Sequence, residues 1–319
     1  MPPPPPELTE GAIFEVLLRL PPDDPASLVH ASLVCKPWRG ILSDPGFPRR
    51  YREFHRSLPI LGFLRNNIYP SASSWLKERT CSLAPIAMAN SPPLLIPELH
   101  CPGGWALDSR HGRVLMDRES GDSHVLAVWD PVTGGRHVLE TPGGKDDAFH
   151  HSVHSAMVLC SAANCDHCDC SRGPFLVVFV TSYSSKAHAW VYSSETGAWS
   201  VPAVLGIHGR AFVERKRRVI VGDEICCFLL GGGGAPGNRA RFTGVLKYDL
   251  GRHCLSVIEA PEVYEDSVVL MSMDASSLGF AGVRGSTLYL WSRKVKPMED
   301  IGWVQYCHTP ISEVLEYTV

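Results

Sequence analysis

The chain has 319 residues, of which 45% are hydrophobic and 20% charged, as in an ordinary globular protein of one or two domains. A net charge of −3 provides no basic field for nucleic acid, and no apolar run approaches the roughly 18 residues of a membrane span. The start, MPPPPPELTE, lacks the features of a signal peptide. We therefore expect a cytoplasmic or nuclear protein that is not secreted, whose 11 cysteines are mostly free thiols.

The first predicted helix follows a proline-rich tail at residues 1–7, which we expect to be extended and disordered. Thr9 can cap this helix, and Pro21-Pro22 ends it. The apolar residues recur at the i, i+3, i+4, i+7 spacing of one helix face, at Ile13, Val16, Leu17 and Leu20.

Two further short helices are predicted directly after the first. Asp24-Pro25 indicates an N-cap followed by proline at the first helical position, which opens a helix over Ala26–Val34. The third helix would begin near Pro37 and end before Asp44-Pro45. Three helices in about forty residues cannot bury all of their apolar side chains among themselves. We therefore expect some apolar surface to await a partner.

A basic helical pattern follows at Pro48–Ser57, with Tyr51 and Phe54 on one side. Its arginines suggest a nucleic-acid site, but Glu53 interrupts them. Surface arginines on a linking helix are usually a solvated face, so we predict no nucleic-acid binding.

From Leu58 onward the pattern changes to that of an all-β region. Short runs rich in Val, Phe, Trp and Tyr alternate with turns, and Gly and Pro are plentiful. The predicted strands are Val125–Trp129, Phe175–Val180, Ala187–Tyr192, Ile225–Leu230, Gly244–Tyr248 and Thr287–Trp291.

This region contains a repeat of strand, polar turn with glycine, and returning strand. Copies occupy Val125–Leu139, Ala187–Val201 and Gly244–Ile258, and a fourth is cut short at Leu288–Val295. In the third copy, Asp249-Leu250-Gly251 are predicted to supply the turn. The spacing of the copies is near the roughly 40–50 residue period of propeller blades once loop insertions are allowed. Such a unit cannot bury its face alone, which implies stacked or radial sheets.

Potential metal ligands are concentrated in the segment 160–170, at Cys160, Cys165, His167, Cys168 and Cys170. They are soft ligands, and Cys165-x-x-Cys168 has one C-x-x-C spacing of a zinc site. No second paired set follows, because Cys226-Cys227 lies in a predicted strand where neighbours point to opposite faces. The sequence therefore favours a polar inter-blade loop, and we predict no metal and no cofactor.

Two other patterns also favour structural interpretations. Gly231–Gly234 lacks the Gly-Lys-Ser/Thr ending of a phosphate loop and predicts a mobile connection between strands. Arg215–Arg218 resembles a nuclear signal, but its apolar flanks, Ala211–Val213 and Val219–Val221, predict the charged tip of a hairpin.

A histidine group, His150, His151 and His154, lies in a predicted loop that leads into Ala156–Leu159. Without a carboxylate beside it, the group is weak evidence for a metal site or for catalysis. The sequence contains none of the G-x-S-x-G, His-Glu-x-x-His and dinucleotide-binding motifs. We predict no catalytic residues and no enzyme activity.

Residues Leu8–Phe47 resemble an F-box, the helical module that binds the Skp-type adaptor of SCF (cullin–RING) ubiquitin ligases. The most specific pieces are LLRLPPDD at Leu17–Asp24 and SLVCKPWRGILSDPGF at Ser32–Phe47, in which V-C-K-x-W stands in the family's order. The resemblance implies a set of adaptor-binding or docking-support residues: Leu8, Ile13, Leu17, Pro21, Leu28, Val34, Cys35, Trp38 and Ile41. A generic helical cap on the next domain is the alternative.

The second part resembles the β-propeller-like F-box-associated regions of large plant F-box families, especially those of grasses. The resemblance rests on Gly104–Met116, Trp129–Gly134, Pro174–Val180, Tyr248–Ile258 and Leu288–Val295. It implies four blade units and a weaker one in Leu58–Pro97. Either the last blade is incomplete or strands not visible in the sequence close the circle. The expected domains are the tail at 1–7, the F-box and linking helix at 8–57, and the β domain at 58–319.

The predicted function is that of a substrate receptor in an SCF-type ubiquitin ligase. The resemblance implies an F-box bound to the Skp-type adaptor, and through it to the cullin–RING ligase, and a β domain bound to an unknown target protein. One alternative is a ubiquitin-independent or decayed scaffold, because Thr9 replaces the family's usual proline and Gly11 lies inside the first helix. A propeller enzyme is a further alternative, since a fold does not fix a function.

Overall fold

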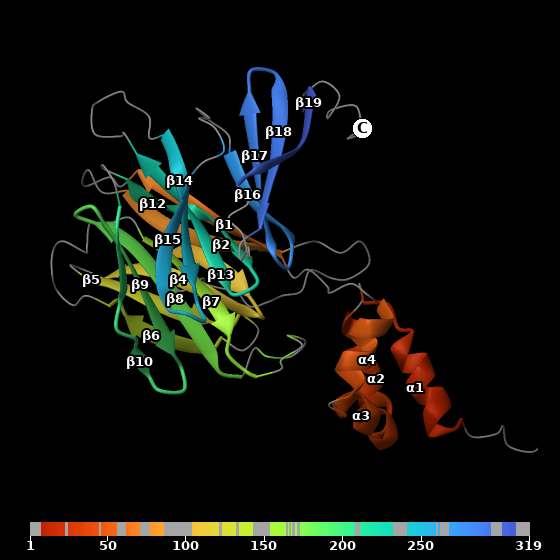
Figure 1. Cartoon of the computed structure of the whole chain (residues 1–319). Helices are drawn as coiled ribbons and strands as arrows, with labels where there is room; N and C mark the ends of the chain where they lie inside the picture. The colour runs from red at the N-terminus through yellow and green to blue at the C-terminus, as the bar shows by residue number, and fades with distance from the viewer. Residues whose placement is uncertain are drawn as a thin grey trace, which may run out of the picture. The chain divides into compact units, whose positions relative to one another are not determined.

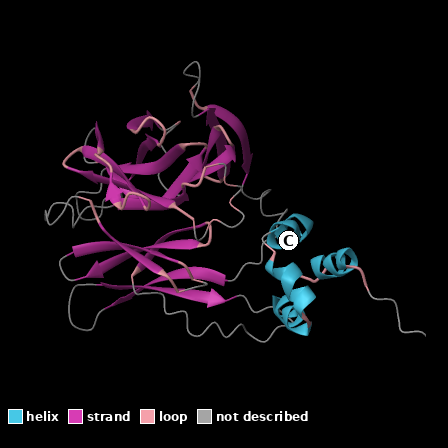
Figure 2. Ribbon diagram, turned by 90° about the horizontal axis from the view of Figure 1, so that it is seen from below, coloured by secondary structure: helices cyan, strands magenta, loops and turns pink. Residues whose placement is uncertain are grey.

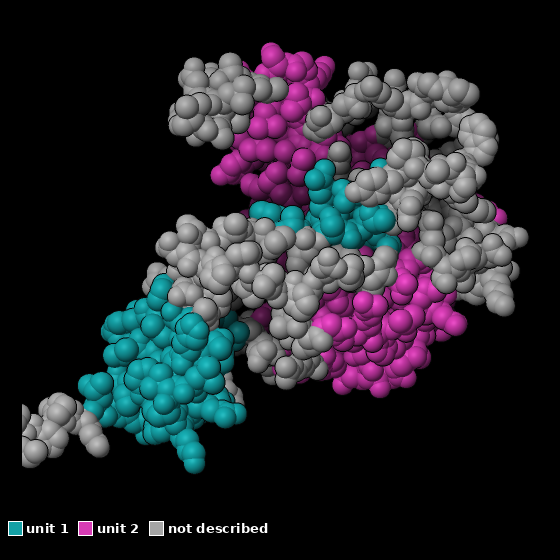
Figure 3. Space-filling model, turned by 180° about the vertical axis from the view of Figure 1, so that it is seen from behind, with its two compact units in different colours: residues 1–105 teal, residues 106–319 magenta. Residues whose placement is uncertain are grey.

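The computed structural model describes residues 8–22, 25–44, 46–55, 62–70, 77–85, 104–120, 123–131, 134–142, 154–163, 165, 167, 170, 173–207, 211–231, 241–259, 261, 268–294 and 302–310. The chain divides into two compact units, residues 1–105 and 106–319 (Figure 3). The predicted boundary between the F-box segment and the β domain at residue 58 stays a prediction, as do the tail at 1–7 and the glycine run from residue 232, which lie outside the described residues.

The helices of the first unit are α1 (Glu10–Leu18), α2 (Pro25–Val34), α3 (Lys36–Ser43) and α4 (Gly46–His55) (Figures 1 and 2). Thr9 caps α1 as predicted, because its hydroxyl accepts the Ala12 N–H at 3.3 Å. Pro25 is the first residue of α2, whereas Asp24 lies outside the described residues. The fourth helix begins at Gly46, earlier than predicted, because the Asp44 carboxylate accepts the Gly46 N–H at 2.7 Å.

The four helices share one small core. Its buried members are Leu17, Ala31, Ile41 and Phe47. The last helix is part of this packing, since the Tyr51 hydroxyl donates to the Leu20 carbonyl at 2.6 Å. The His55 ring also hydrogen-bonds the Leu18 carbonyl at 2.8 Å, at the end of α1. The segment predicted as a linking helix therefore stabilises the other three.

A two-stranded antiparallel hairpin, β1 (Gly62–Pro70) and β2 (Lys77–Pro85), also falls in the first unit. It lies within Leu58–Pro97, where the sequence predicts a weaker β unit.

The second unit contains four sheets in its described part, and neighbouring strands pair in chain order. The first comprises β3 (Trp105–Arg110), β4 (Arg113–Ser120), β5 (Ser123–Trp129) and β6 (Arg136–Glu140). The second comprises β7 (His154–Cys160), β8 (Phe175–Tyr183), β9 (Lys186–Ser193) and β10 (Ala198–Trp199), with β11 (Ala203–Gly206) also paired to β9. The third comprises β12 (Phe212–Val221), β13 (Glu224–Gly231), β14 (Arg241–Asp249) and β15 (Cys254–Glu259). The fourth comprises β16 (Val268–Asp274), β17 (Ser277–Arg284), β18 (Thr287–Lys294) and β19 (Val304–Pro310).

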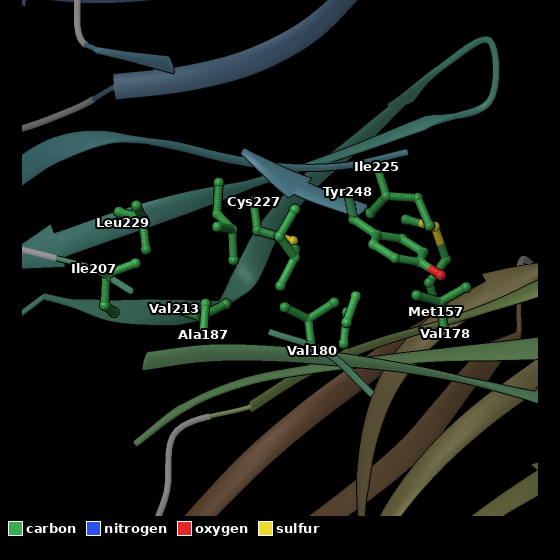
Figure 4. Close-up of a cluster of buried hydrophobic side chains, with 14 residues drawn as sticks. Met157, Val178, Val180, Ala187, Ile207, Val213, Ile225, Cys227, Leu229 and Tyr248 are labelled. Carbon is green, nitrogen blue, oxygen red and sulfur yellow. The ribbon is translucent and has the colours of Figure 1, made fainter. Parts of the chain in front are cut away.

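The second unit is therefore an all-β, propeller-like repeat, as predicted. Each sheet is built on a four-stranded meander, to which the second sheet adds β11, and consecutive sheets contact one another, β7 with β12 and β12 with β16. The second and third sheets bury a cluster that includes Met157, Val180, Cys227 and Tyr248 (Figure 4). This packing supplies the burial that one strand-turn-strand unit lacks alone.

The three complete repeats turn at structurally equivalent positions. The aromatic residues Trp129, Tyr192 and Tyr248 pair across the turn with Arg136, Trp199 and Leu255. In each repeat, the residue two places before that partner has a left-handed backbone: Gly134, Gly197 and His253, with φ of 75°, 67° and 53°. The predicted residues Leu250 and Gly251 do lie in the third turn, where the Asp249 carboxylate accepts the Arg252 N–H at 2.8 Å, but the left-handed residue is His253. His253 tolerates the conformation because its ring accepts from the Tyr248 hydroxyl at 2.6 Å and donates to the Val201 carbonyl at 2.7 Å.

The fourth repeat is complete, which corrects the prediction that it is cut short. The strand β18 pairs with β19, which returns after a longer connection. Trp303, just before β19, donates its indole N–H to the Glu259 carbonyl at 2.7 Å. Trp199 in the second sheet makes the equivalent bond to the Glu140 carbonyl at 2.9 Å. Each of these tryptophans thus ties its sheet to the last strand of the preceding one.

The basic run before Val219 is part of one strand, so the predicted hairpin tip is wrong. β12 runs from Phe212 to Val221, with a bulge between Val213 and Arg218. The Arg218 side chain is buried 3.5 Å from the Asp108 carboxylate, and burial lowers the pKa of its guanidinium. The bulge interrupts the regular pairing of β12 with β13 between Val213 and Arg218, so the charged run lies in the strand at an irregular part of the ladder.

A testable pH effect arises at the turn between β16 and β17. The Asp274 carboxylate accepts hydrogen bonds from the Ser277 hydroxyl at 2.7 Å and from the backbone N–H and hydroxyl of Ser276 at 2.7 and 2.9 Å. These bonds lower the pKa of Asp274 from its ordinary value of 3.8. The ionised form therefore stabilises the fold above that value, and the contribution is lost as the pH falls from 3.8 towards the lowered pKa.

We therefore expect wild type to be more stable than Asp274→Asn at neutral pH, by an amount that shrinks in acid below the ordinary carboxyl pKa. Urea denaturation of both proteins across this pH range measures the difference. A difference that stays constant with pH would contradict the assignment.

Candidate functional site

Several large apolar side chains of the helical segment are exposed. Leu33 is 76% exposed and Val34 63%, both at the end of α2. Leu8, just before α1, is 64% exposed. Val29 of α2 and Val16 of α1 are also more than half exposed. The helices therefore leave apolar surface outside their shared core, as the sequence predicts, and such surface is typical of an interaction site.

The structure divides the nine predicted adaptor-binding residues into three groups. Leu17 and Ile41 are buried in the helical core, where a partner cannot touch them. Ile13, Leu28 and Trp38 are partly buried and pack against that core. The exposed members are Leu8, Pro21, Val34 and Cys35. Only the exposed and partly buried groups can contact a partner, and the buried pair can act only by holding the helices together.

Sequence reasoning missed Val16, Val29 and Leu33 as surface residues. The predicted stripe of α1 divides in the structure, because it supplies Leu17 to the core and leaves Val16 exposed. The available signal was the composition of α2, PASLVHASLV, which has more apolar residues than one face can hold. The apolar residues of α2 that find no place in the core, Val29, Leu33 and Val34, remain exposed.

A second cluster lies in the connection between β7 and β8. Cys160, Cys165, His167 and Cys170 each place one potential ligand atom within 4.8 Å of the others. The His167 Nδ1 is 3.8 Å from the Cys170 sulfur, and the His167 N–H donates to the Cys165 sulfur at 3.4 Å. Burial, followed by the neighbouring Cys160, raises the pKa of the Cys170 thiol to about 12. Cys168 lies outside the described residues.

The paired cysteines of β13 point to opposite faces, as predicted. Cys227 packs between the second and third sheets, whereas Cys226 packs in the core shared by the third and fourth. Burial raises the pKa of both thiols, that of Cys227 to about 11. Neither can chelate a metal together with the other.

The prediction that His154 lies in a loop is wrong, because it is the first residue of β7. Its Nε2 is 3.2 Å from the Asp117 carboxylate, and both side chains are almost fully buried. This pair lies inside the sheets and cannot reach a substrate in solution. His150 and His151 lie outside the described residues.

No helix in the described part of the chain is long and apolar enough to cross a membrane. Residues 5–50 match the model of the F-box domain. The chain is 25% identical over 158 residues to "Putative F-box protein At3g16210" of Arabidopsis thaliana, a match that covers 44% of this chain and 35% of that protein. The chain therefore spans about a third of the length of this curated relative.

Among the solved structures that the chain matches is TolB from Acinetobacter baumannii, at 11% identity and a TM-score of 0.34, over 76% of this chain and 56% of that one. The uncharacterized protein lmo1340 of Listeria monocytogenes has 9% identity and a TM-score of 0.31, over 64% of each chain. These scores say nothing about function. Together with the four helices and the four-sheet unit, the match of residues 5–50 to the F-box model shows that this chain carries an F-box domain, followed by an all-β, propeller-like region.

Proposed function

We propose that this chain is the substrate-recognition subunit of an SCF-type ubiquitin ligase. In this role the F-box binds the Skp-type adaptor, and through it the cullin–RING ligase. The β region binds a target protein, and the chain contributes proximity between target and ligase rather than catalysis. The observation that carries the proposal is the set of exposed apolar side chains on the helices of an F-box fold, namely Leu8, Val16, Val29, Leu33 and Val34.

This surface, which we call the apolar helical surface, fits a partner that offers a hydrophobic groove. Aliphatic side chains on a helix are the usual anchors in such grooves. Leu33 and Val34 are adjacent and both mostly exposed, so they offer the largest unburied apolar area of α2. Their burial by the adaptor would supply binding energy that the folded chain alone does not use.

Two departures from the family pattern favour a decayed scaffold, but both are compatible with the observed helix. Thr9 replaces the usual proline and caps α1 through its hydroxyl. Gly11 has no atom within 4 Å of where a Cβ would stand, so it is not required by a close contact. Its cost is about 1 kcal/mol relative to alanine, which the helical core offsets. These residues are therefore compatible with a competent F-box.

The test measures binding of a purified Skp-type adaptor to the full chain. We expect Leu33→Asp combined with Val34→Asp to weaken binding at least about 30-fold, because two charges would be buried in an apolar contact. Val201→Asp is the matched control, since Val201 is 81% exposed but lies in the second unit. It should bind like wild type.

Equal affinity of the double variant and the control would overturn the assigned surface. A folded wild-type chain that does not bind the adaptor at all would support the ubiquitin-independent scaffold instead. Circular dichroism of each variant establishes that the chain is folded.

A further inference from the structure

The cluster of Cys160, Cys165, His167 and Cys170 has the chemistry of a metal site. Three sulfur atoms and one imidazole nitrogen come from a single connection, between β7 and β8. Three thiolates and one imidazole form a closed four-ligand set of the kind that structural zinc sites use. Harder cations such as Mg²⁺ and Ca²⁺ prefer oxygen ligands, which this set lacks.

The distances suit a tetrahedral ion. Zinc lies about 2.3 Å from sulfur and about 2.0 Å from nitrogen, so neighbouring ligand atoms are separated by roughly 3.5–3.8 Å. The observed separation of His167 Nδ1 from the Cys170 sulfur is 3.8 Å, and no pair in the cluster exceeds 4.8 Å. The ligands therefore need to move by about 1 Å at most to surround zinc.

The surrounding structure holds two of the four ligands firmly. Cys160 is the last residue of β7, and its backbone pairs with Phe175 of β8. Cys170 is buried, and its carbonyl accepts the Gly173 N–H at 3.1 Å. The Gly173 carbonyl in turn accepts a hydrogen bond from the buried Arg113 of β4. The cluster is thus anchored to both the first and the second sheet.

The other two ligands lie on the connection itself. His167 has a left-handed backbone, with φ of 59°, which is uncommon for a residue with a side chain. Its ring lies against that of His111, with 4.3 Å between ring centroids. In this conformation the His167 ring is directed towards the Cys170 sulfur, with Nδ1 3.8 Å away, while the residue itself stays exposed to solvent.

We propose that Cys160, Cys165, His167 and Cys170 bind one zinc ion, which closes the connection between β7 and β8. Binding releases the three thiol protons to solvent and leaves a ZnS₃N centre of net charge −1. The guanidinium of Arg113, which hydrogen-bonds the end of the connection, supplies an opposite charge nearby. The site is independent of the F-box, so it stands whether or not the adaptor binds.

The first experiment measures the metal content of the purified full chain by inductively coupled plasma mass spectrometry. We expect about one zinc per chain in wild type, and loss of it in Cys165→Ser and in His167→Asn. Both residues lie on the connection rather than in the sheets, so these variants should still fold. Cys254→Ser is the matched control, because Cys254 is an exposed cysteine in β15 and should leave the zinc content unchanged.

A second experiment replaces zinc by Co²⁺, whose spectrum reports the ligands. Wild type and Cys254→Ser should show thiolate-to-cobalt charge transfer and the intense visible bands of a tetrahedral site, and Cys165→Ser should lose them. Cys168→Ser tests the remaining cysteine of the segment, and it should keep both zinc and the cobalt spectrum.

Three results would overturn the proposal. One is a folded wild-type chain with no more zinc than Cys165→Ser. Another is a chain whose mass reveals a disulfide within the cluster in place of bound metal. The third is loss of zinc in Cys168→Ser with retention in His167→Asn, which would refute the assigned ligand set.

Discussion

Phe228→Ala is expected to lower the free energy of unfolding of the β region by about 3–5 kcal/mol. Phe228 is fully buried in the core that the third and fourth sheets share. Its ring meets that of Phe242 edge to face, with 5.0 Å between centroids, and Phe242 stacks on Phe280 at 5.2 Å. Truncation removes both the buried area and the first ring of this series, and the strands around it cannot close the resulting cavity fully.

The measurement is urea denaturation of the full chain, followed by tryptophan fluorescence. Val257→Ala is the matched control, because Val257 lies in β15 of the same sheet but is 44% exposed. The control should change stability by less than about 0.5 kcal/mol. A midpoint for Phe228→Ala equal to that of the control would show that the two sheets do not pack as described.

The predicted elements that the structure confirms are those with strong local signals. The helix cap at Thr9 and the strands rich in Val, Phe, Trp and Tyr depend on residues within one element, and the structure has them where predicted. The returning strand of the fourth repeat was missed because it is distant along the chain. The available signal was Gly302-Trp303. In the second sheet, Gly197 precedes the returning strand β10 and Trp199 lies in it, and Trp199 and Trp303 make equivalent hydrogen bonds.

The errors in the β region have a common physical cause. His253 takes the left-handed position that glycine takes in the first two turns, and it is held there by hydrogen bonds to the Tyr248 hydroxyl and to the Val201 carbonyl. Arg218 can lie in a strand because its buried guanidinium forms an ion pair with the carboxylate of Asp108, which is remote in sequence. In both cases contacts with residues of other elements outweigh the local conformational preference of the sequence. A local sequence pattern does not reveal those contacts.

The candidate sites show the same division. Resemblance identified the helical module, but it did not separate buried from exposed positions, so Leu17 and Leu33 could not be assigned to core and surface. The zinc proposal needs the hairpin of β7 and β8, which brings Cys160 back beside Cys170. The spacing of the cysteines along the chain argued against a metal, because it does not show that Cys160, at the end of β7, lies beside Cys170.

Leu17→Ala is expected to destabilise the helical module by about 2–5 kcal/mol and thereby to abolish adaptor binding at physiological temperature. Leu17 is completely buried, and it packs with Ala31, Ile41 and Phe47, the buried members of this core among the residues that the structure describes. A module of this size is stabilised by only a few kcal/mol, so the loss is comparable to the whole. The β region should keep its own unfolding transition.

The contrasting variant is Val16→Ala, one residue away in α1 but 52% exposed. It should leave the helices intact and weaken adaptor binding directly, because Val16 belongs to the apolar helical surface rather than to the core. Hydrogen exchange measured by mass spectrometry separates the two effects. In Leu17→Ala the amides of α1–α4 should lose protection, while in Val16→Ala they should exchange as in wild type. If Leu17→Ala retained that protection and still failed to bind, Leu17 would have to be an adaptor contact, which its burial forbids in the structure described here.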